Sequence, residues 1–260
     1  MSGGDFGRTG LLGSPRISVA IVAMGGQGGG VLADWIVALA EQEGWAAQST
    51  SVPGVAQRTG ATIYYIEMAP AKPGAQPVFA LMPAPGDVDV VLASELMEAG
   101  RSMMRGLVTP ERTTLIASTH RAFAVAEKQT PGDGVADPAV VSIAADFAAK
   151  KVIAFDMEAL AKANGSVISA AMFGALAAAA VLPFGRAAFE SAVRAGGTGV
   201  ESSLRAFAAA FDQTQHCFVI DPQYRGYFFN CINFHHASFF WARPFRARQG
   251  MTQRTRLLAW

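Results

Sequence analysis

Residues 17–30, with the sequence ISVAIVAMGGQGGG, constrain the fold more than any other part of the chain. The β-branched first half predicts a buried strand, and the glycines around Gln27 predict a tight turn. Residues 31–43 then have the pattern of a helix that ends at Gly44. A strand, a glycine turn and a helix in this order present backbone N–H groups to an anion. The segment therefore predicts an α/β domain with an anion-binding turn.

The rest of the chain alternates between strand-like and helix-like segments. This alternation predicts a three-layer α/β/α Rossmann-like sandwich with a mostly parallel or mixed sheet. One strand, residues 61–68, follows a loop instead of a helix, so it is a candidate for antiparallel pairing. An alanine-rich run of roughly 15 residues is too short to span a bilayer and predicts a buried helix. We expect strands at 46–51, 61–68, 78–82, 87–93, 113–118 and 151–156. We expect helices at 95–104, with Ser94 as the N-terminal cap, and at 140–150, 157–164, 167–182, 184–194 and 201–212.

Composition predicts three regions. Residues 1–15 are rich in Gly and Ser and predict a flexible arm, whereas residues 16–213 predict the α/β domain. Residues 214–260 form an irregular tail that is rich in aromatic residues and arginine and contains no lysine. Two interpretations of the tail stay open: a subunit-docking arm, or a disordered, non-native reading frame attached to a truncated subunit.

The bulk composition narrows the function classes. The chain is 51% hydrophobic and 16% charged, so it is globular, and its net charge of +1 gives no case for nucleic-acid binding. We also expect no association with a membrane. Two cysteines, Cys217 and Cys231, are too few for a disulfide framework or a four-thiolate cluster, which predicts a cytoplasmic protein. These cysteines and the nearby histidines lack the spacing of a zinc site, so we expect no metal.

The first candidate site is the glycine turn. We expect Gly25, Gly26, Gln27 and Gly28 to bind a ligand: the glycines would let it approach the backbone closely, and Gln27 would supply a neutral amide. No Lys-Ser/Thr pair follows, which argues against a P-loop. No acidic residue ends the strand at 46–51, which argues against dinucleotide binding. The alternative is a tight strand-to-helix turn without a ligand.

The second candidate site is the loop of residues 54–60, GVAQRTG. Here Gln57 and Arg58 stand between glycines, and a guanidinium can bind an anion through two parallel hydrogen bonds. The alternative is an ordinary surface arginine.

Several other polar residues receive structural interpretations. We interpret His120 as a solvated loop residue, with a proton shuttle as the alternative. Glu95 and Glu98, three residues apart, predict a solvated helix face. We expect three methionines near this helix to fill space in the core: Met97, Met103 and Met104.

Together, the two loops resemble the gamma-type domain of the 2-oxoacid:ferredoxin oxidoreductases. That family has a strand, a G-x-G-G-Q-G turn, a helix and, roughly 25 residues later, a G-x-x-x-R-G-G-like loop. This chain has AMGGQG at 23–28 and GVAQRTG at 54–60, with Ala23 and Thr59 in place of glycines. Residues 85–93, 95–101 and 172–176 agree, and the resemblance is closest to the indolepyruvate oxidoreductase beta subunit.

The resemblance implies a division of labour between subunits. A large catalytic alpha subunit would carry thiamine diphosphate and iron–sulfur clusters and would pass electrons to ferredoxin or another acceptor. This chain would hold no cofactor alone, and its two loops would face the inter-subunit cleft, where CoA phosphates or the substrate carboxylate could bind. The resemblance names no catalytic residue. A stand-alone CoA- or nucleotide-binding module and a docking-only paralogue are the alternatives.

Overall fold

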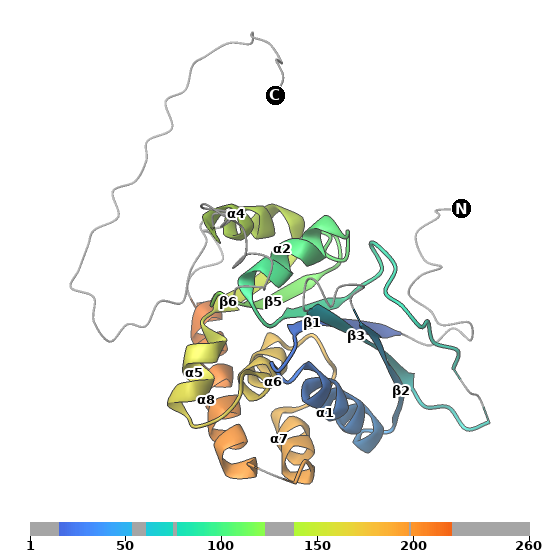
Figure 1. Ribbon diagram of the computed structural model, residues 1–260. Helices are drawn as coiled ribbons and strands as arrows, with labels where there is room; N and C mark the ends of the chain where they lie inside the picture. The colour runs from blue at the N-terminus through green and yellow to red at the C-terminus, as the bar shows by residue number, and fades with distance from the viewer. Residues whose placement is uncertain (1–15, 54–60, 75–76, 123–137, 198, 220–260) are drawn as a thin grey trace, which may run out of the picture.

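A mixed six-stranded sheet between two helical layers forms the centre of the computed structural model (Figure 1). The structure describes residues 16–53, 61–74, 77–122, 138–197 and 199–219. The strand order is β2-β3-β1-β4-β5-β6. The strands are β1 (Ile17–Met24), β2 (Trp45–Pro53), β3 (Ala61–Pro70), β4 (Val90–Ala93), β5 (Thr114–Ser118) and β6 (Lys151–Phe155).

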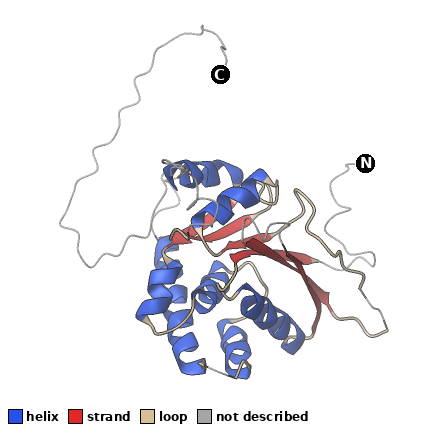
Figure 2. Cartoon of the chain, viewed as in Figure 1, coloured by secondary structure: helices blue, strands red, loops and turns tan. Residues whose placement is uncertain are grey.

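Helices cover both faces of the sheet, which confirms the three-layer prediction (Figure 2). One layer contains α2 (Leu96–Met104) and α4 (Pro138–Ala148). The other layer contains α1 (Gly29–Gln42), α5 (Met157–Ala163), α6 (Ile168–Ala179), α7 (Arg186–Ala195) and α8 (Val200–Val219).

The larger core lies under the five-helix layer and is rich in aromatic residues. The ring of Phe173 on α6 lies 5.6 Å from Trp35 and 4.8 Å from Phe189, centroid to centroid. Phe207 of α8 completes the group at 5.9 Å from Phe173. Aromatic pairs at these separations add stabilisation beyond the area that they bury. The alanine-rich helix α6 is almost completely buried, as the sequence predicts.

Strand β1 lies at the point where the sheet changes direction. It pairs antiparallel with β3 and parallel with β4, and β4, β5 and β6 continue in parallel. The prediction of a mixed sheet with an antiparallel strand at residues 61–68 is therefore confirmed. As a consequence, the carboxyl ends of β1, β4, β5 and β6 lie at one edge of the sheet, where ligands bind in open α/β folds.

Charged side chains connect the strands at the opposite edge, where β1 and β4 begin. Arg16 pairs with Glu67 of β3 and with Asp87. Arg112 bridges Asp87 and Asp89, with its Nε 2.7 Å from Asp89 Oδ1. Burial alone would raise the pKa of Asp89, but hydrogen bonds from Arg112 and from a backbone N–H lower it overall. These ion pairs join β3 to the segments that enter β1, β4 and β5, at the edge away from the glycine turn.

Two predicted strands differ in the structure. Residues 78–82 form no strand, because side chains replace the backbone ladder there: Gln48 donates to the carbonyl of Ala80 at 3.2 Å, and Thr50 donates to that of Leu81 at 2.8 Å. Strand β4 begins at Val90 and not at residue 87, because the acidic residues before it join the ion-pair cluster.

The ends of two helices also differ from the prediction. Helix α2 begins one residue later than expected, and its cap is Glu95, which accepts a hydrogen bond from the Glu98 N–H at 2.9 Å. Ser94 is therefore not the cap. Helix α8 continues to Val219, and residues 1–15 and 220–260 lie outside the described part of the chain.

The described residues contain no single helix long and apolar enough to cross a membrane. Only the combined length of α5 and α6 would be sufficient among these residues, and the two helices meet at a bend of 114°.

Close packing of α6 against α8 generates the first prediction. A methyl group on Gly174 would lie 2.2 Å from the backbone carbonyl oxygen of Phe207, which cannot yield without moving a helix. Gly174→Ala should therefore lower the free energy of unfolding by about 1–3 kcal/mol. Urea denaturation followed by circular dichroism measures this change.

Gly100→Ala is the matched control, because Gly100 also lies inside a helix. Its added methyl group would meet only the side chain of Val141, at 3.3 Å. The control should gain up to about 1 kcal/mol from helix propensity. Equal stabilities for the two variants would contradict the packing argument.

Candidate functional site

The glycine turn joins the end of β1 to the start of α1. Gly26 and Gly28 have φ values of +83° and +70°, which favour glycine. Side chains at Gly25 and Gly26 would meet none of the described residues within 4 Å. A methyl group on Gly29, in contrast, would lie 2.6 Å from the ring of Tyr64 and 2.8 Å from Ala23 Cβ. No described residue covers this side of the backbone at Gly25 and Gly26, whereas packing requires a glycine at position 29.

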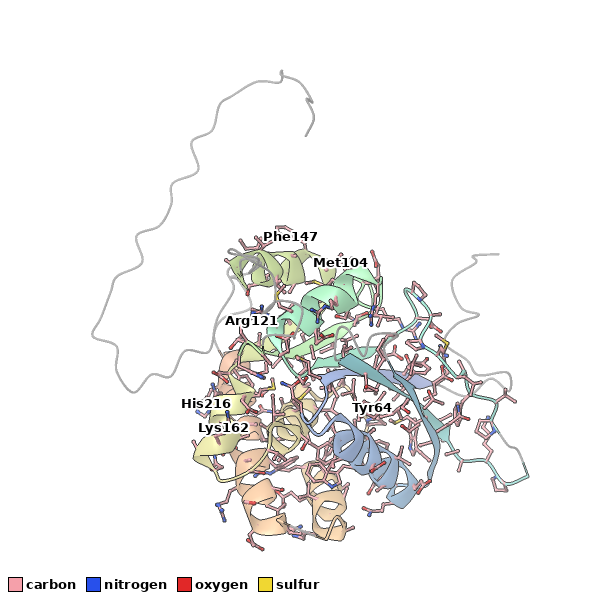
Figure 3. All side chains as sticks on the ribbon, in the orientation of Figure 1. Tyr64, Met104, Arg121, Phe147, Lys162 and His216 are labelled. Atoms are coloured by element: carbon pink, nitrogen blue, oxygen red, sulfur yellow. The ribbon has the colours of Figure 1, made fainter. Side chains whose placement is uncertain are left out.

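The ring of Tyr64, a β3 residue labelled in Figure 3, lies against Gly29 and Gly30 at the start of α1. Helix α1 has no side-chain cap, and its first intrahelical bond runs from the Leu32 N–H to the Gly28 carbonyl at 3.0 Å. The N–H groups before Leu32 carry the partial positive charge of a helix N-terminus. The turn and the helix start therefore present donors on the open side.

Gln27 points back into the protein and organises the turn. Its Oε1 accepts hydrogen bonds from the Met24 N–H, at 3.1 Å, and from the hydroxyl of Ser94. Its Nε2 lies 3.3 Å from Nε2 of His120. The sequence placed Gln27 in the turn as a residue that faces a ligand; the structure shows that its amide contacts the ends of β1, β4 and β5.

His120 is a half-buried, hydrogen-bonded residue, so its interpretation as a solvated loop histidine is wrong. Its Nδ1 lies 2.8 Å from Ser118 Oγ, which also accepts from the Met157 N–H at 3.1 Å. Burial lowers the pKa of His120, and the carboxylates of Glu158 and Asp156 partly oppose this shift. This shift favours the neutral imidazole at pH 7.

Sequence reasoning missed Ser94 and Ser118, which contact Gln27 and His120. Each stands at the carboxyl end of a parallel strand, Ser94 directly after β4 and Ser118 as the last residue of β5. The carboxyl ends of parallel strands meet at one edge of the sheet. The polar residues at the ends of the predicted strands could therefore have identified both serines as candidates.

Two buried acidic groups lie beside this edge. Glu95 and Glu98 are 1% and 0% exposed, so the prediction of a solvated face is wrong. Glu95 Oε2 lies 3.1 Å from Arg121 Nη1, and Glu98 pairs with Arg101. Burial raises the pKa of Glu98, and Arg101 only partly opposes this shift.

The start of α6 also approaches the glycine turn. Ser169 is fully buried, and its Oγ lies 3.1 Å from the position that a Cβ on Gly28 would occupy. This hydroxyl has no hydrogen-bond partner among the described residues. The buried start of α6 therefore leaves little room for a side chain at position 28. No pattern in the sequence predicted this contact.

Gln57 and Arg58 lie outside the described residues, but the strands that flank their loop are placed. Pro53, at the end of β2, pairs with Thr62, and Ala61, at the start of β3, pairs with Met24 of β1. The β3 end of the second loop therefore lies beside Met24, the last residue of β1, and its β2 end lies one strand further away.

No group of three or more His, Cys, Asp or Glu residues that could hold a metal occurs among the described residues.

Two of the three methionines predicted to fill the core do so. Met97 and Met103 pack against the core beneath α2. Met104 is 89% exposed, so the prediction of core filling is wrong at that position.

Comparison with known proteins identifies the family. A family model described as pyruvate ferredoxin/flavodoxin oxidoreductase matches residues 18–213. The chain belongs to this family. No curated protein matches the sequence.

Solved structures share the fold of this pyruvate ferredoxin/flavodoxin oxidoreductase family member at low sequence identity. A pyruvate oxidoreductase subunit from Thermotoga maritima is 17% identical with a TM-score of 0.51, covering 76% of this chain and 96% of that one. The gamma subunit of a keto/oxoacid ferredoxin oxidoreductase from Geobacter sulfurreducens is 18% identical with a TM-score of 0.51, covering 77% and 99%.

A third match is a larger protein. The 2-oxoglutarate:ferredoxin oxidoreductase from Magnetococcus marinus, solved with 2-oxoglutarate, coenzyme A and succinyl-CoA bound, is 14% identical with a TM-score of 0.51. The match covers 77% of this chain but only 31% of the larger one, so the chain spans about a third of that enzyme chain.

Burial of Glu98 generates the second prediction. Its folded-state pKa lies above the ordinary value of 4.5, so its ionisation costs stability as the pH rises through the folded-state pKa. Glu98→Gln removes that cost. Relative to the wild type, its free energy of unfolding should improve on going from about pH 4 to pH 7, on the order of 1 kcal/mol. Urea denaturation at both pH values measures the change.

Glu190→Gln is the control with the opposite sign. Hydrogen bonds from Arg186 and Arg194 lower the pKa of Glu190 despite the opposing effect of burial. Its replacement should cost a few tenths of a kcal/mol more at pH 7 than at pH 4. The same pH trend in both variants would refute the assignment for Glu98.

Proposed function

We propose that this chain is a subunit of a 2-oxoacid:ferredoxin, or related acceptor, oxidoreductase and that it acts with a large catalytic alpha subunit. The family match over residues 18–213 carries this proposal. The alpha subunit would hold thiamine diphosphate and the iron–sulfur clusters, because the two cysteines of this chain are too few for a four-thiolate cluster. The complex would decarboxylate a 2-oxoacid oxidatively to an acyl-CoA.

In this proposal the glycine turn and Arg58 form the part of the site that this chain contributes. Gly25, Gly26 and Gly28 would bring backbone donors to an anion, and Arg58 would bind it bidentately. Three observations support this role: the space beside Gly26 that no described residue fills, the uncapped start of α1, and the pairing of Ala61, at one end of the Arg58 loop, with Met24. The structure of a family relative with coenzyme A bound makes CoA phosphates the first candidate anion.

The finer features of the proposal rest on the sequence resemblance. An arylpyruvate of the indolepyruvate type stays the predicted substrate, ferredoxin the predicted acceptor and the cytoplasm the predicted location. A stand-alone CoA- or nucleotide-binding module is the second candidate, because the open glycine turn alone would suffice for it.

Reconstitution tests the proposed division of labour. The isolated chain should show no oxidoreductase activity, because it lacks the groups that carry the redox chemistry. Addition of the alpha subunit should restore reduction of a viologen dye that depends on a 2-oxoacid and CoA. Full activity of the alpha subunit alone would overturn the proposal.

The glycine turn generates a separate binding prediction. Gly26→Ala would place a methyl group in the open space where the anion should bind, and we expect CoA affinity to fall at least about tenfold, or 1.4 kcal/mol. Isothermal titration calorimetry of the reconstituted complex measures the affinity.

Gly44→Ala is the matched control, because Gly44 has φ +76° and open space around it at the other end of α1. Both substitutions strain the backbone by about 1 kcal/mol, but only Gly26→Ala should weaken CoA binding. Equal affinities in the two variants would exclude the turn as the CoA site. CoA, NAD or FAD binding to the chain alone would favour the stand-alone module.

A further inference from the structure

The hydrogen-bond donors and acceptors around Gln27 determine which ring nitrogen of His120 carries the proton. The backbone N–H of Met24 can only donate, so the Gln27 atom 3.1 Å from it must be the amide oxygen. The amide nitrogen of Gln27 then faces His120 Nε2 at 3.3 Å. Because that nitrogen is a donor, His120 Nε2 must accept with its lone pair.

The other ring nitrogen completes the assignment. A neutral imidazole whose Nε2 accepts carries its proton on Nδ1. Nδ1–H can donate to Ser118 Oγ, 2.8 Å away, and this hydroxyl is held in place by the N–H of Met157. The carbonyl of His120 also accepts the Leu96 N–H at 3.2 Å, which ties the residue to the start of α2. The imidazole is therefore held from several sides.

Protonation of His120 would disrupt this arrangement. A proton on Nε2 would point at the amide N–H groups of Gln27, so two donors would face each other. Reversal of the Gln27 amide would relieve that contact, but it would turn the amide nitrogen toward the Met24 N–H. Either geometry leaves a donor without an acceptor where β1 meets the glycine turn, at a cost of about 1–3 kcal/mol.

We propose that His120 is a positioning residue that holds the glycine turn in its ligand-binding shape only while its Nε2 is unprotonated. Acidification would therefore release the turn before the fold itself is lost. Ligand binding enters this inference only through the proposed function, whereas the coupling between His120 and the turn does not depend on any ligand.

Charged groups around His120 determine where the transition occurs. Asp156 and Glu158, from α5 and its cap, and Glu95, before α2, favour the imidazolium, and Lys162 opposes it. Arg121, labelled in Figure 3, pairs with Glu95. Burial outweighs the carboxylates, so the folded-state pKa of His120 lies below the ordinary 6.5. The stabilisation of the turn is complete above pH 6.5 and is lost as the pH falls through that lower pKa.

Nuclear magnetic resonance of the full chain labelled with ¹⁵N-histidine tests the tautomer directly. Of the four histidines in the sequence, His120 is identified by the signal that disappears in His120→Gln. We expect a neutral Nδ1–H tautomer at pH 7.5 and a titration midpoint below 6.5. An Nε2–H tautomer, or an imidazolium at pH 7.5, would overturn the inference.

Hydrogen exchange of the peptide that contains the glycine turn tests the coupling. After correction for intrinsic exchange, the open fraction of the turn should rise by up to about tenfold for each pH unit below about 6.5, until His120 is fully protonated. His120→Gln should abolish this rise, because its Oε1 can accept from Gln27 without titrating. His216→Gln is the matched control: His216 is an exposed residue of α8 whose Nδ1 lies 2.6 Å from the Asp212 carbonyl, and the variant should behave like the wild type.

Gln27→Glu is the second variant and keeps the test informative if His120→Gln is poorly folded. A carboxylate at position 27 would still accept from Met24 and Ser94, but it would favour a protonated His120. The titration midpoint of His120 should rise by about 1 pH unit or more. An unchanged midpoint would exclude contact between the two side chains.

Calorimetry with CoA separates this inference from the proposed function. Loss of CoA binding at low pH in the wild type but not in His120→Gln would support both. The expected resonance and exchange results without any CoA binding would support the coupling and contradict the proposed function. CoA binding with the same pH profile in both proteins would retain the proposed function and refute the coupling.

Discussion

The backbone N–H of Met24 needs a partner where the central sheet ends, and much of the candidate site follows from this requirement. Met24 and Val22 point their backbone groups to the same side of β1, because strand residues alternate. Val22 there accepts from the Ser94 N–H at 3.0 Å, and β4 ends at Ala93. Gln27 Oε1 serves as the acceptor beyond that end. A partly buried donor thus finds its acceptor in the turn that follows the strand.

This arrangement gives Gln27 a structural role as well as a place in the turn. Its amide accepts from β1 and from Ser94, and it faces His120 after β5. The glycines can therefore leave their backbone exposed, because the polar side chain among them is used internally. At the other edge, ion pairs between Arg16, Arg112 and three carboxylates join the strands, so the two edges are organised by different chemistry.

Periodicity and glycine placement predicted the layered fold, the mixed sheet and the turn, because each depends on local sequence. The His120 environment could not be predicted, since it depends on residues from three strand ends that are far apart in the chain. Glu98 was misread because helical spacing shows which residues share a face but not whether another layer covers that face. Residues 78–82 have a strand-like composition, yet side chains of β2 satisfy their backbone carbonyls. Nothing in the local sequence reports such a contact.

The antiparallel pairing of β2 with β3 has a consequence for how this family can diversify. The two strands remain in register from Trp45 opposite Pro70 to Pro53 opposite Thr62. Insertions or deletions between Pro53 and Ala61 would therefore leave the register of the sheet unchanged, because both anchor points are held by the ladder. Evolution can change the length and chemistry of the segment that contains Arg58 independently of the scaffold. The glycine turn has no such freedom, since Gly29 is confined by Tyr64 and Ala23.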